Sequence, residues 1–205
     1  MTNQQKLSKI TPEEYLAFEE SAKQRHEYVD GQLFAMTGGS AAHNVISLNI
    51  AMSLRTKLKG KGCTVFMADM KIRIEDVNCF YYSDVLVDCG TFDNKSVYTS
   101  TPIAIFEVLS RSTASTDRRE KLVAYRHVAS IKQYVIVHQT RKRLEVYRKI
   151  ADEWSIQEIG SCESLVLDIC QNQPITILME DIYADIEFDE GPDLQVREDV
   201  EAYTW

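Results

Sequence analysis

The first part of the chain alternates between helix-like and hairpin-like patterns of apolar and polar residues. Thr11-Pro12-Glu13-Glu14 combines an N-cap threonine, a first-turn proline and a glutamate at the third helical position, and it predicts a helix that runs to about Lys23. Residues 25–37 predict a hairpin, because Asp30-Gly31 is a strong turn signal.

A long helix is predicted after the chain break at Gly38-Gly39. Ser40 can cap its first turn, and Gly60-Lys61-Gly62 ends it. Apolar residues recur at helical spacing within it, and the positions predicted to form its apolar face are Val45, Leu48, Ala51, Met52 and Leu58.

Strand patterns dominate the middle of the chain. Residues 64–74 alternate in part and predict one strand, with Lys71, Arg73 and Glu75 pointing outward. Runs 80–89 and 103–109 are apolar on both faces, which predicts central, covered strands. Further elements are predicted as a polar turn at 110–116, a helix at 117–128, strands at 133–138, 144–149, 154–159 and 164–169, and a closing helix at 176–183.

The order of these elements predicts an α/β fold, a mixed sheet flanked by helices. Strand 103–109, the following helix and strand 133–138 have the order of a parallel crossover unit. Such units carry functional groups at the carboxyl ends of their strands, and Glu107 lies near such an end. The length of 205 residues suits one domain, which we place at residues 1–187.

Charge is distributed unevenly along the chain. The net charge is -8, and residues 180–205 hold ten of the 31 acidic residues but one of the 23 basic ones. Residues 188–205 therefore predict a flexible acidic tail. The remaining body is close to neutral, so it could still bind phosphates locally.

Composition also bears on location. No apolar run approaches the length of a membrane span, and no apolar segment follows the first six residues, so we expect neither a membrane anchor nor a signal peptide. The five cysteines show no zinc-like spacing and are expected to be small core residues of a cytoplasmic protein: Cys63, Cys79, Cys89, Cys162 and Cys170.

Acidic residues inside apolar runs are the candidate chemistry. Glu107 interrupts residues 103–109, Asp84 interrupts 81–87, and Glu27 lies in the charged entry to the first hairpin. A buried carboxylate is costly unless it is paired, protonated or bound to a metal. Lys121, on the helix predicted after the Glu107 strand, supplies a cation. This pattern predicts a divalent-metal site for phosphodiester hydrolysis.

Each acid also has a simpler interpretation. Glu107 could be held by backbone amides or by Lys121 without any metal. Asp84 could face water on an edge strand, since Asp88 has the same parity. Glu27 lies in a polar stretch and could be a surface carboxylate.

The helical residues have structural alternatives as well. Asp117 precedes Lys121 by four residues, so the two could form a solvated pair worth roughly 0.3–0.5 kcal/mol. Tyr125 continues that helical face and could simply pack. His43 is more often a capping or core histidine than a catalyst.

Several blocks together resemble the Uma2 family, also called DUF820 endonuclease-like proteins, a branch of the PD-(D/E)XK restriction-endonuclease fold. The resemblance covers nearly the whole chain to about Tyr183. The blocks that carry it are His26-Glu27-Tyr28-Val29-Asp30-Gly31-Gln32, Gly38-Gly39-Ser40-Ala41-Ala42-His43, Ser83-Asp84-Val85-Leu86-Val87, the run from Pro102 to Thr113, Asp117-x-x-x-Lys121-x-x-x-Tyr125, and the run from Ile131 to Val137.

The resemblance implies a restriction-endonuclease-like mixed sheet and a set of roles. Asp84 and Glu107 would bind Mg²⁺ or Mn²⁺, with the Val108 carbonyl as a further ligand. Glu27 would be the accessory acid. The lysine of the parent pattern sits two residues after the acid, and in this branch Lys121 would take its place.

Three positions depart from the parent pattern. Leu109 stands where the strand lysine is usual, Ser83 where a proline is usual, and His138 where an acid usually ends the later strand. None of these changes removes a proposed ligand.

The resemblance implies a magnesium-dependent endonuclease, a hydrolase that acts on nucleic acid, DNA in the first place. A homodimer would suit cleavage of both strands of a duplex. One alternative is a catalytically silent nuclease-fold module that binds nucleic acid or a protein partner. Another is a hydrolase of a smaller phosphate compound.

Overall fold

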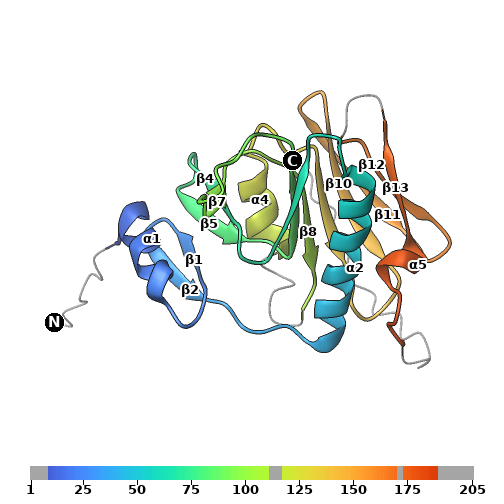
Figure 1. The fold of residues 1–205 in the computed structure, drawn as a ribbon, viewed down its shortest axis with the longest axis horizontal. Coiled ribbons are helices and arrows are strands. Elements are labelled where there is room, and N and C mark those ends of the chain that lie inside the picture. Colours follow the sequence, from blue (N-terminus) through green and yellow to red (C-terminus); the bar gives the residue numbers. More distant parts are fainter. Residues whose placement is uncertain (1–8, 111–116, 170–172, 189–205) are drawn as a thin grey trace.

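The computed structural model describes residues 9–110, 117–169 and 173–188 (Figure 1). Its helical segments are α1 (Pro12–Ser21), α2 (Ala41–Leu58), the π-helical turn η1 (Asp117–Lys121), α4 (Leu122–Tyr125) and α5 (Met179–Ile182). Its strands are β1 (His26–Val29), β2 (Gln32–Ala35), β3 (Thr64–Met67), β4 (Lys71–Ile74), β5 (Cys79–Tyr82), β6 (Val85–Asp88), β7 (Tyr98–Thr99), β8 (Pro102–Val108), β9 (Gln133–Val137), β10 (Leu144–Ile150), β11 (Glu153–Ile159), β12 (Ser164–Leu167) and β13 (Ile175–Leu178).

A six-stranded mixed sheet is the centre of the fold. Its order is β11-β10-β9-β8-β6-β3, and β8 and β9 are its parallel pair, which confirms the predicted crossover unit. Alternate residues of β8 enter two different hydrophobic clusters. Phe106 packs with buried residues of α2, whereas Ile105 packs with Tyr125 of α4, so the two helices cover opposite faces of the sheet.

A second sheet of five strands, ordered β2-β1-β5-β4-β7, carries the N-terminal elements. The predicted capping box is present: Thr11 Oγ1 accepts the Glu14 N–H, and the Glu14 side chain accepts the Thr11 N–H. The predicted hairpin also forms, with Asp30 and Gly31 both at positive φ. Tyr15 of α1 stacks on Tyr28, which fastens the helix to this sheet.

Residues 64–74 and 80–89 are not single strands, and the prediction of one strand for each is wrong. Each run divides between the two sheets: β3 and β6 belong to the six-stranded sheet, β4 and β5 to the five-stranded one. Ala68, at φ +41°, lies in the first break, and Ser83-Asp84 form the second. An apolar run that continues from one sheet into the next looks like one long strand, because each half is covered by its own core.

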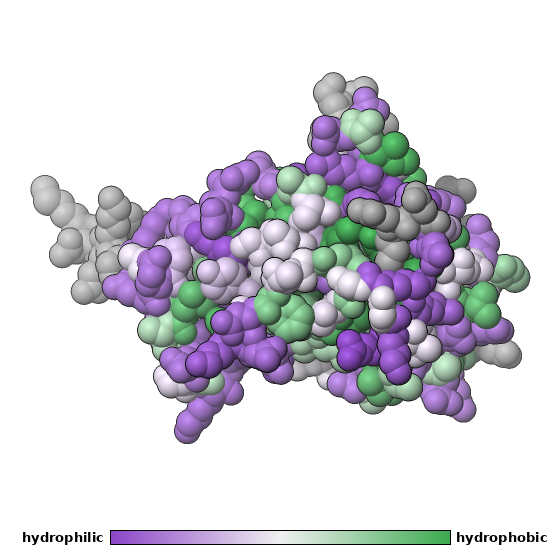
Figure 2. Space-filling model, turned by 45° about the horizontal axis from the view of Figure 1, so that its top comes forward, coloured by the Kyte–Doolittle hydropathy of each residue, from purple (hydrophilic) through white to green (hydrophobic). Residues whose placement is uncertain are grey.

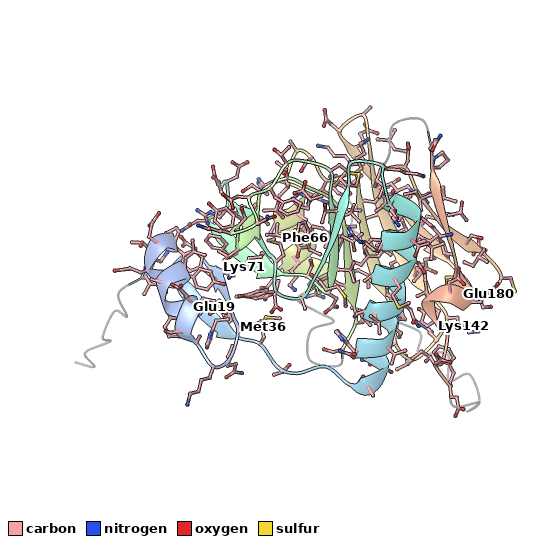
Figure 3. The ribbon with its side chains drawn as sticks, in the orientation of Figure 1. Glu19, Met36, Phe66, Lys71, Lys142 and Glu180 are labelled. Carbon is pink, nitrogen blue, oxygen red and sulfur yellow. A yellow bond between two sulfur atoms is a disulfide. The ribbon has the colours of Figure 1, made fainter. Side chains whose placement is uncertain are left out.

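Lys71 also differs from its prediction. Its side chain does not point outward but is buried, with the ammonium 5.3 Å from the centre of the Tyr82 ring and near Glu19 (Figure 3). Burial lowers the pKa of this lysine. The Val97 carbonyl accepts a hydrogen bond from the ammonium at 3.5 Å, so a polar contact and an aromatic ring replace water.

The predicted apolar face of α2 is only partly correct. Ala51 and Leu58 are buried as expected, but Leu48 is 44% exposed and Met52 is 59% exposed. The buried positions that the prediction omitted are Ile46, Ile50 and Leu54. Apolar and polar residues are both spread around this helix, so periodicity could not decide which stripe meets the sheet.

Two further predictions need correction. Residues 176–183 are not one helix, because the first part of this segment belongs to β13, which pairs with β12, and α5 comes after it. Cys63 and Cys89 form a disulfide, so the expectation that all five cysteines are simple core residues is wrong for these two. They lie one step beyond the Thr64–Asp88 pair of β3 and β6, a register that the sequence alone does not reveal. Cys79 is a buried core residue as predicted, Cys162 is exposed, and Cys170 lies outside the described residues.

Among the described residues, no helix has the length and apolar character needed to cross a bilayer. On the face seen in Figure 2, hydrophilic residues cover most of the surface, and hydrophobic residues lie in small groups between them. The acidic segment from residue 189 onward lies outside the described residues, so its flexibility stays a prediction.

The corrected face of α2 yields a stability prediction. Ile50→Ala should lower the free energy of unfolding by about 2–5 kcal/mol, because it removes most of a fully buried side chain and leaves a cavity in its place. Leu48→Ala, two residues earlier on the same helix, should cost less than about 1 kcal/mol. Urea unfolding followed by circular dichroism measures both, and equal losses would contradict the observed orientation of α2.

Candidate functional site

Asp84, just before β6, and Glu107 of β8 occupy opposite positions along the backbone of two neighbouring chain segments. Val85 of β6 pairs with Phe106 of β8, so the next step of the antiparallel register sets Asp84 opposite Glu107. Asp84 does not interrupt a strand, as the sequence suggested, but lies in the break between β5 and β6. It is not on an edge strand, because β6 pairs with both β3 and β8.

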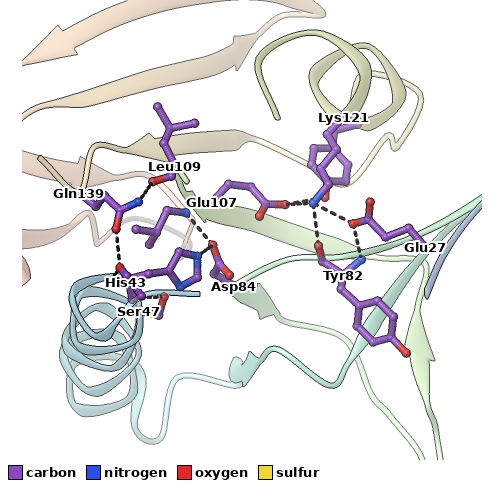
Figure 4. Close-up of polar contacts among 12 residues, drawn as sticks. Glu27, His43, Ser47, Tyr82, Asp84, Glu107, Leu109, Lys121 and Gln139 are labelled. Atoms are coloured by element: carbon purple, nitrogen blue, oxygen red, sulfur yellow. Dashed lines mark hydrogen bonds and ion pairs between the residues drawn. The ribbon is translucent and has the colours of Figure 1, made fainter. Parts of the chain in front are cut away.

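Lys121 joins two of the three candidate acids (Figure 4). Its ammonium lies 2.9 Å from Glu27 Oε1 and 3.1 Å from Glu107 Oε1, and it donates to the Tyr82 carbonyl at 2.9 Å. The Lys121 side chain is 6% exposed, so it is not a solvated surface lysine. Charges removed from water must be paired closely, and this cation has two carboxylates as partners.

The segment that carries Lys121 is anchored by its own apolar residues. Lys121 ends the π-helical turn η1, and Leu122, Ala124 and Tyr125 of α4 are buried against the sheet. The Tyr125 hydroxyl donates to Glu107 Oε1 at 3.1 Å. Tyr125 therefore holds the same carboxylate oxygen as Lys121, a role that its interpretation as a packing residue missed.

Asp84 is held from two other directions. Its Oδ2 accepts the Val108 N–H at 2.7 Å and lies 3.2 Å from His43 Nε2. His43 comes from the first turn of α2, where Ser40 Oγ accepts its N–H at 3.1 Å. The sequence reading of His43 as a capping or core histidine missed this contact. The only signal for it was the position of His43 in one of the blocks that resemble the family.

Glu27 is attached to the site through Tyr82. Glu27 Oε1 accepts the Tyr82 N–H at 3.4 Å, and its side chain is 13% exposed, so it is not a surface carboxylate. The Tyr82 hydroxyl donates to Glu19 Oε1 at 3.0 Å, and the same carboxylate accepts the His26 N–H at 2.9 Å. Burial, with the Glu19 charge next in importance, raises the pKa of Tyr82. The phenol therefore stays protonated and can donate.

The donor set suits a hard divalent cation. Asp84 and Glu107 offer carboxylate oxygens, and the Val108 N–H bonded to Asp84 shows that this backbone edge of β8 faces the site. An extended residue directs its N–H and C=O to the same side, so the Val108 carbonyl is directed there too. Among the described residues, no three His, Cys, Asp or Glu side chains gather around one point. Mg²⁺ commonly binds through one or two carboxylates and keeps several waters.

Comparisons with known proteins identify the family of this chain. The family model Uma2, described as "Putative restriction endonuclease", matches residues 12–177. Two uncharacterized proteins of Synechocystis sp. are similar: slr1290 is 37% identical over 161 residues, which cover 78% of this chain and 85% of the relative, and sll1609 is 30% identical over 154 residues, which cover 73% and 87%.

A solved structure shares the fold. It is a crystal structure from Anabaena variabilis described as "a putative nuclease belonging to DUF820". The match has a TM-score of 0.68 at 14% identity and covers 84% of this chain and 97% of the other. At 14% identity, the similarity shows a shared fold alone.

The charge cluster predicts a large stability effect. Lys121→Met keeps the aliphatic stem but leaves Glu27 and Glu107 buried without their cation, so the free energy of unfolding should fall by about 3–5 kcal/mol at neutral pH. Adding Glu107→Gln to that variant should recover part of the loss. Chemical unfolding in the presence of EDTA measures both changes.

Lys9→Met is the matched control, because Lys9 pairs with Asp30 in an exposed position. Its cost should stay below about 1 kcal/mol. A Lys121→Met variant no less stable than this control would contradict the buried charge pairing.

Proposed function

Because the chain belongs to the Uma2 family, we propose that it is a divalent-metal-dependent endonuclease that hydrolyses phosphodiester bonds of nucleic acid, DNA in the first place. One observation supports this proposal above the others. Asp84, just before β6, stands opposite Glu107 of the adjacent strand β8, and the buried Lys121 ammonium lies 3.1 Å from Glu107. Carboxylates at fixed positions beside a cation form a site suited to phosphate chemistry.

In the proposed mechanism, Asp84, Glu107 and the Val108 carbonyl would hold Mg²⁺ or Mn²⁺. A bound cation of this kind polarises a phosphodiester and lowers the pKa of water. Strand β8 carries Glu107 and β6 anchors the backbone next to Asp84, and both strands are interior members of one sheet. Tyr125 and Lys121 set the orientation of Glu107 through its Oε1.

Lys121 has a second proposed role, in charge balance. Its ammonium orients the attacking water or offsets the negative charge that develops on the phosphate in the transition state. Glu27 completes the arrangement as the accessory acid, because it shares Lys121 with Glu107 and keeps the ammonium at the β5–β8 junction. A homodimer would bring two such sites to the two strands of a duplex.

A catalytically silent nuclease-fold module remains the second candidate, and one observation favours it. At least three acceptors surround the Lys121 ammonium, two carboxylates and the Tyr82 carbonyl, and the ammonium has three protons to donate. An ammonium used in this way stabilises the fold and has to exchange a partner before it can contact a phosphate.

Plasmid nicking separates the two candidates. Purified protein with Mn²⁺ should convert supercoiled plasmid to the open-circular form, and Glu107→Gln or Asp84→Asn should slow this reaction by about 100-fold or more. Glu120→Gln is the matched control, because Glu120 is an exposed acid next to Lys121, and it should keep the native rate.

The outcomes are distinct. Metal-dependent nicking that Glu107→Gln and Asp84→Asn both abolish supports the nuclease. DNA binding without nicking, measured by a gel-shift assay on the same preparations, supports the silent module. Nicking that survives in both variants would refute the assignment of this site.

A further inference from the structure

We infer that His43 is a nitrogen ligand of the divalent cation at this site, and that its imidazole makes the site prefer Mn²⁺ to Mg²⁺. The inference rests on the proposed function, since it assumes that Asp84 binds a metal. It adds a ligand and a metal preference that an all-oxygen set would not have.

The separation of His43 and Asp84 suits two ligands of one ion. His43 Nε2 and Asp84 Oδ2 are 3.2 Å apart. Two donor atoms that bind one cation at about 2.1 Å, at right angles, lie about 3 Å from each other. The His43 side chain is 18% exposed and that of Asp84 is 22% exposed, so both are reachable from solvent while most of each is packed.

His43 is held in place along its backbone. Ser40 Oγ accepts the His43 N–H at 3.1 Å, and Ser47 Oγ donates to the His43 carbonyl at 2.8 Å. Ser40 also donates to Gln139 Oε1, and the Gln139 amide donates to the Leu109 carbonyl, both at 2.7 Å. This chain ties the first turn of α2 to the segment just after β8 (Figure 4), and it holds the imidazole at a defined distance from Asp84.

The position of the ring also depends on Gly39. A Cβ at this residue would lie 2.8 Å from His43 Nδ1 and 2.9 Å from its Cγ, closer than a side chain tolerates. A Cβ at Gly38 would meet nothing within 4 Å. Neither glycine is among those with positive φ, so the two differ in what they contact and not in backbone requirement. The pair therefore offers a matched test of the ring position.

The orientation of Glu107 strengthens the inference. Glu107 Oε1 is engaged by Lys121 and Tyr125, whereas Asp84 Oδ2 is engaged by His43 and a backbone amide. The side-chain atom that contacts Asp84 is thus an imidazole nitrogen. Imidazole suits transition-metal ions, while Mg²⁺ favours oxygen ligands and retains its waters.

The test uses Mn²⁺ alone on the full-length protein. Pulsed electron paramagnetic resonance should show the hyperfine coupling of an imidazole ¹⁴N to the bound ion, and His43→Ala should abolish this coupling. The same variant should weaken Mn²⁺ binding about ten-fold or more and change Mg²⁺ binding, measured by competition, less than about three-fold. Bound Mn²⁺ without nitrogen coupling in the native protein would overturn the inference.

The glycine pair gives a second measurement that needs no change to the ligand itself. Gly39→Ala should weaken Mn²⁺ binding several-fold, and Gly38→Ala should leave it within two-fold of the native protein. Native affinity in both variants would contradict the ligand role of His43.

The two levels of the proposal fail differently. Mn²⁺ binding that requires Asp84 but shows no nitrogen coupling removes His43 as a ligand and leaves the proposed nuclease standing. A native protein that binds no Mn²⁺ even at millimolar concentration removes both.

Discussion

The buried ammonium of Lys121 is the constraint on which the site depends. A charge with 6% of its side chain exposed must be neutralised locally, since the protein interior screens poorly. Its two carboxylates come from strands of different sheets, Glu27 from β1 and Glu107 from β8, and its carbonyl partner belongs to Tyr82 at the end of β5. One side chain thus joins the two sheets at the point where β5 ends and the chain turns to Asp84.

A second set of contacts fixes the other side of the site. Ser40 caps α2, and through Gln139 and Leu109 it links that helix to the ends of β9 and β8. The two acids therefore have separate supports: Glu107 is held from the η1–α4 side, and Asp84 from the α2 side. This division sets an imidazole nitrogen beside Asp84 and an ammonium beside Glu107.

Local signals were read correctly wherever a few neighbouring residues decide the structure. The Thr11 capping box, the Asp30-Gly31 turn and the Ser40 cap are each complete within four or five residues, and each appears as predicted. Predictions failed where a partner distant in sequence decides: the division of 64–74 and 80–89 between two sheets, the buried face of α2, the burial of Lys71 and the Cys63–Cys89 disulfide. The apolar character of a segment indicates that it is buried, but not which sheet or helix buries it.

By itself the sequence determined the α/β class, the parallel crossover after β8 and three acids with one lysine as the candidate chemistry, because burial of a charge in an apolar run is costly enough to be informative. Only the tertiary structure decided which of these groups meet. Lys121 pairs with Glu27, 94 residues earlier in the chain, and His43 contacts Asp84 across 41 residues. Such contacts depend on the register of β6 on β8 and on how α2 and α4 pack against opposite faces of the sheet, and no local pattern of residues specifies either.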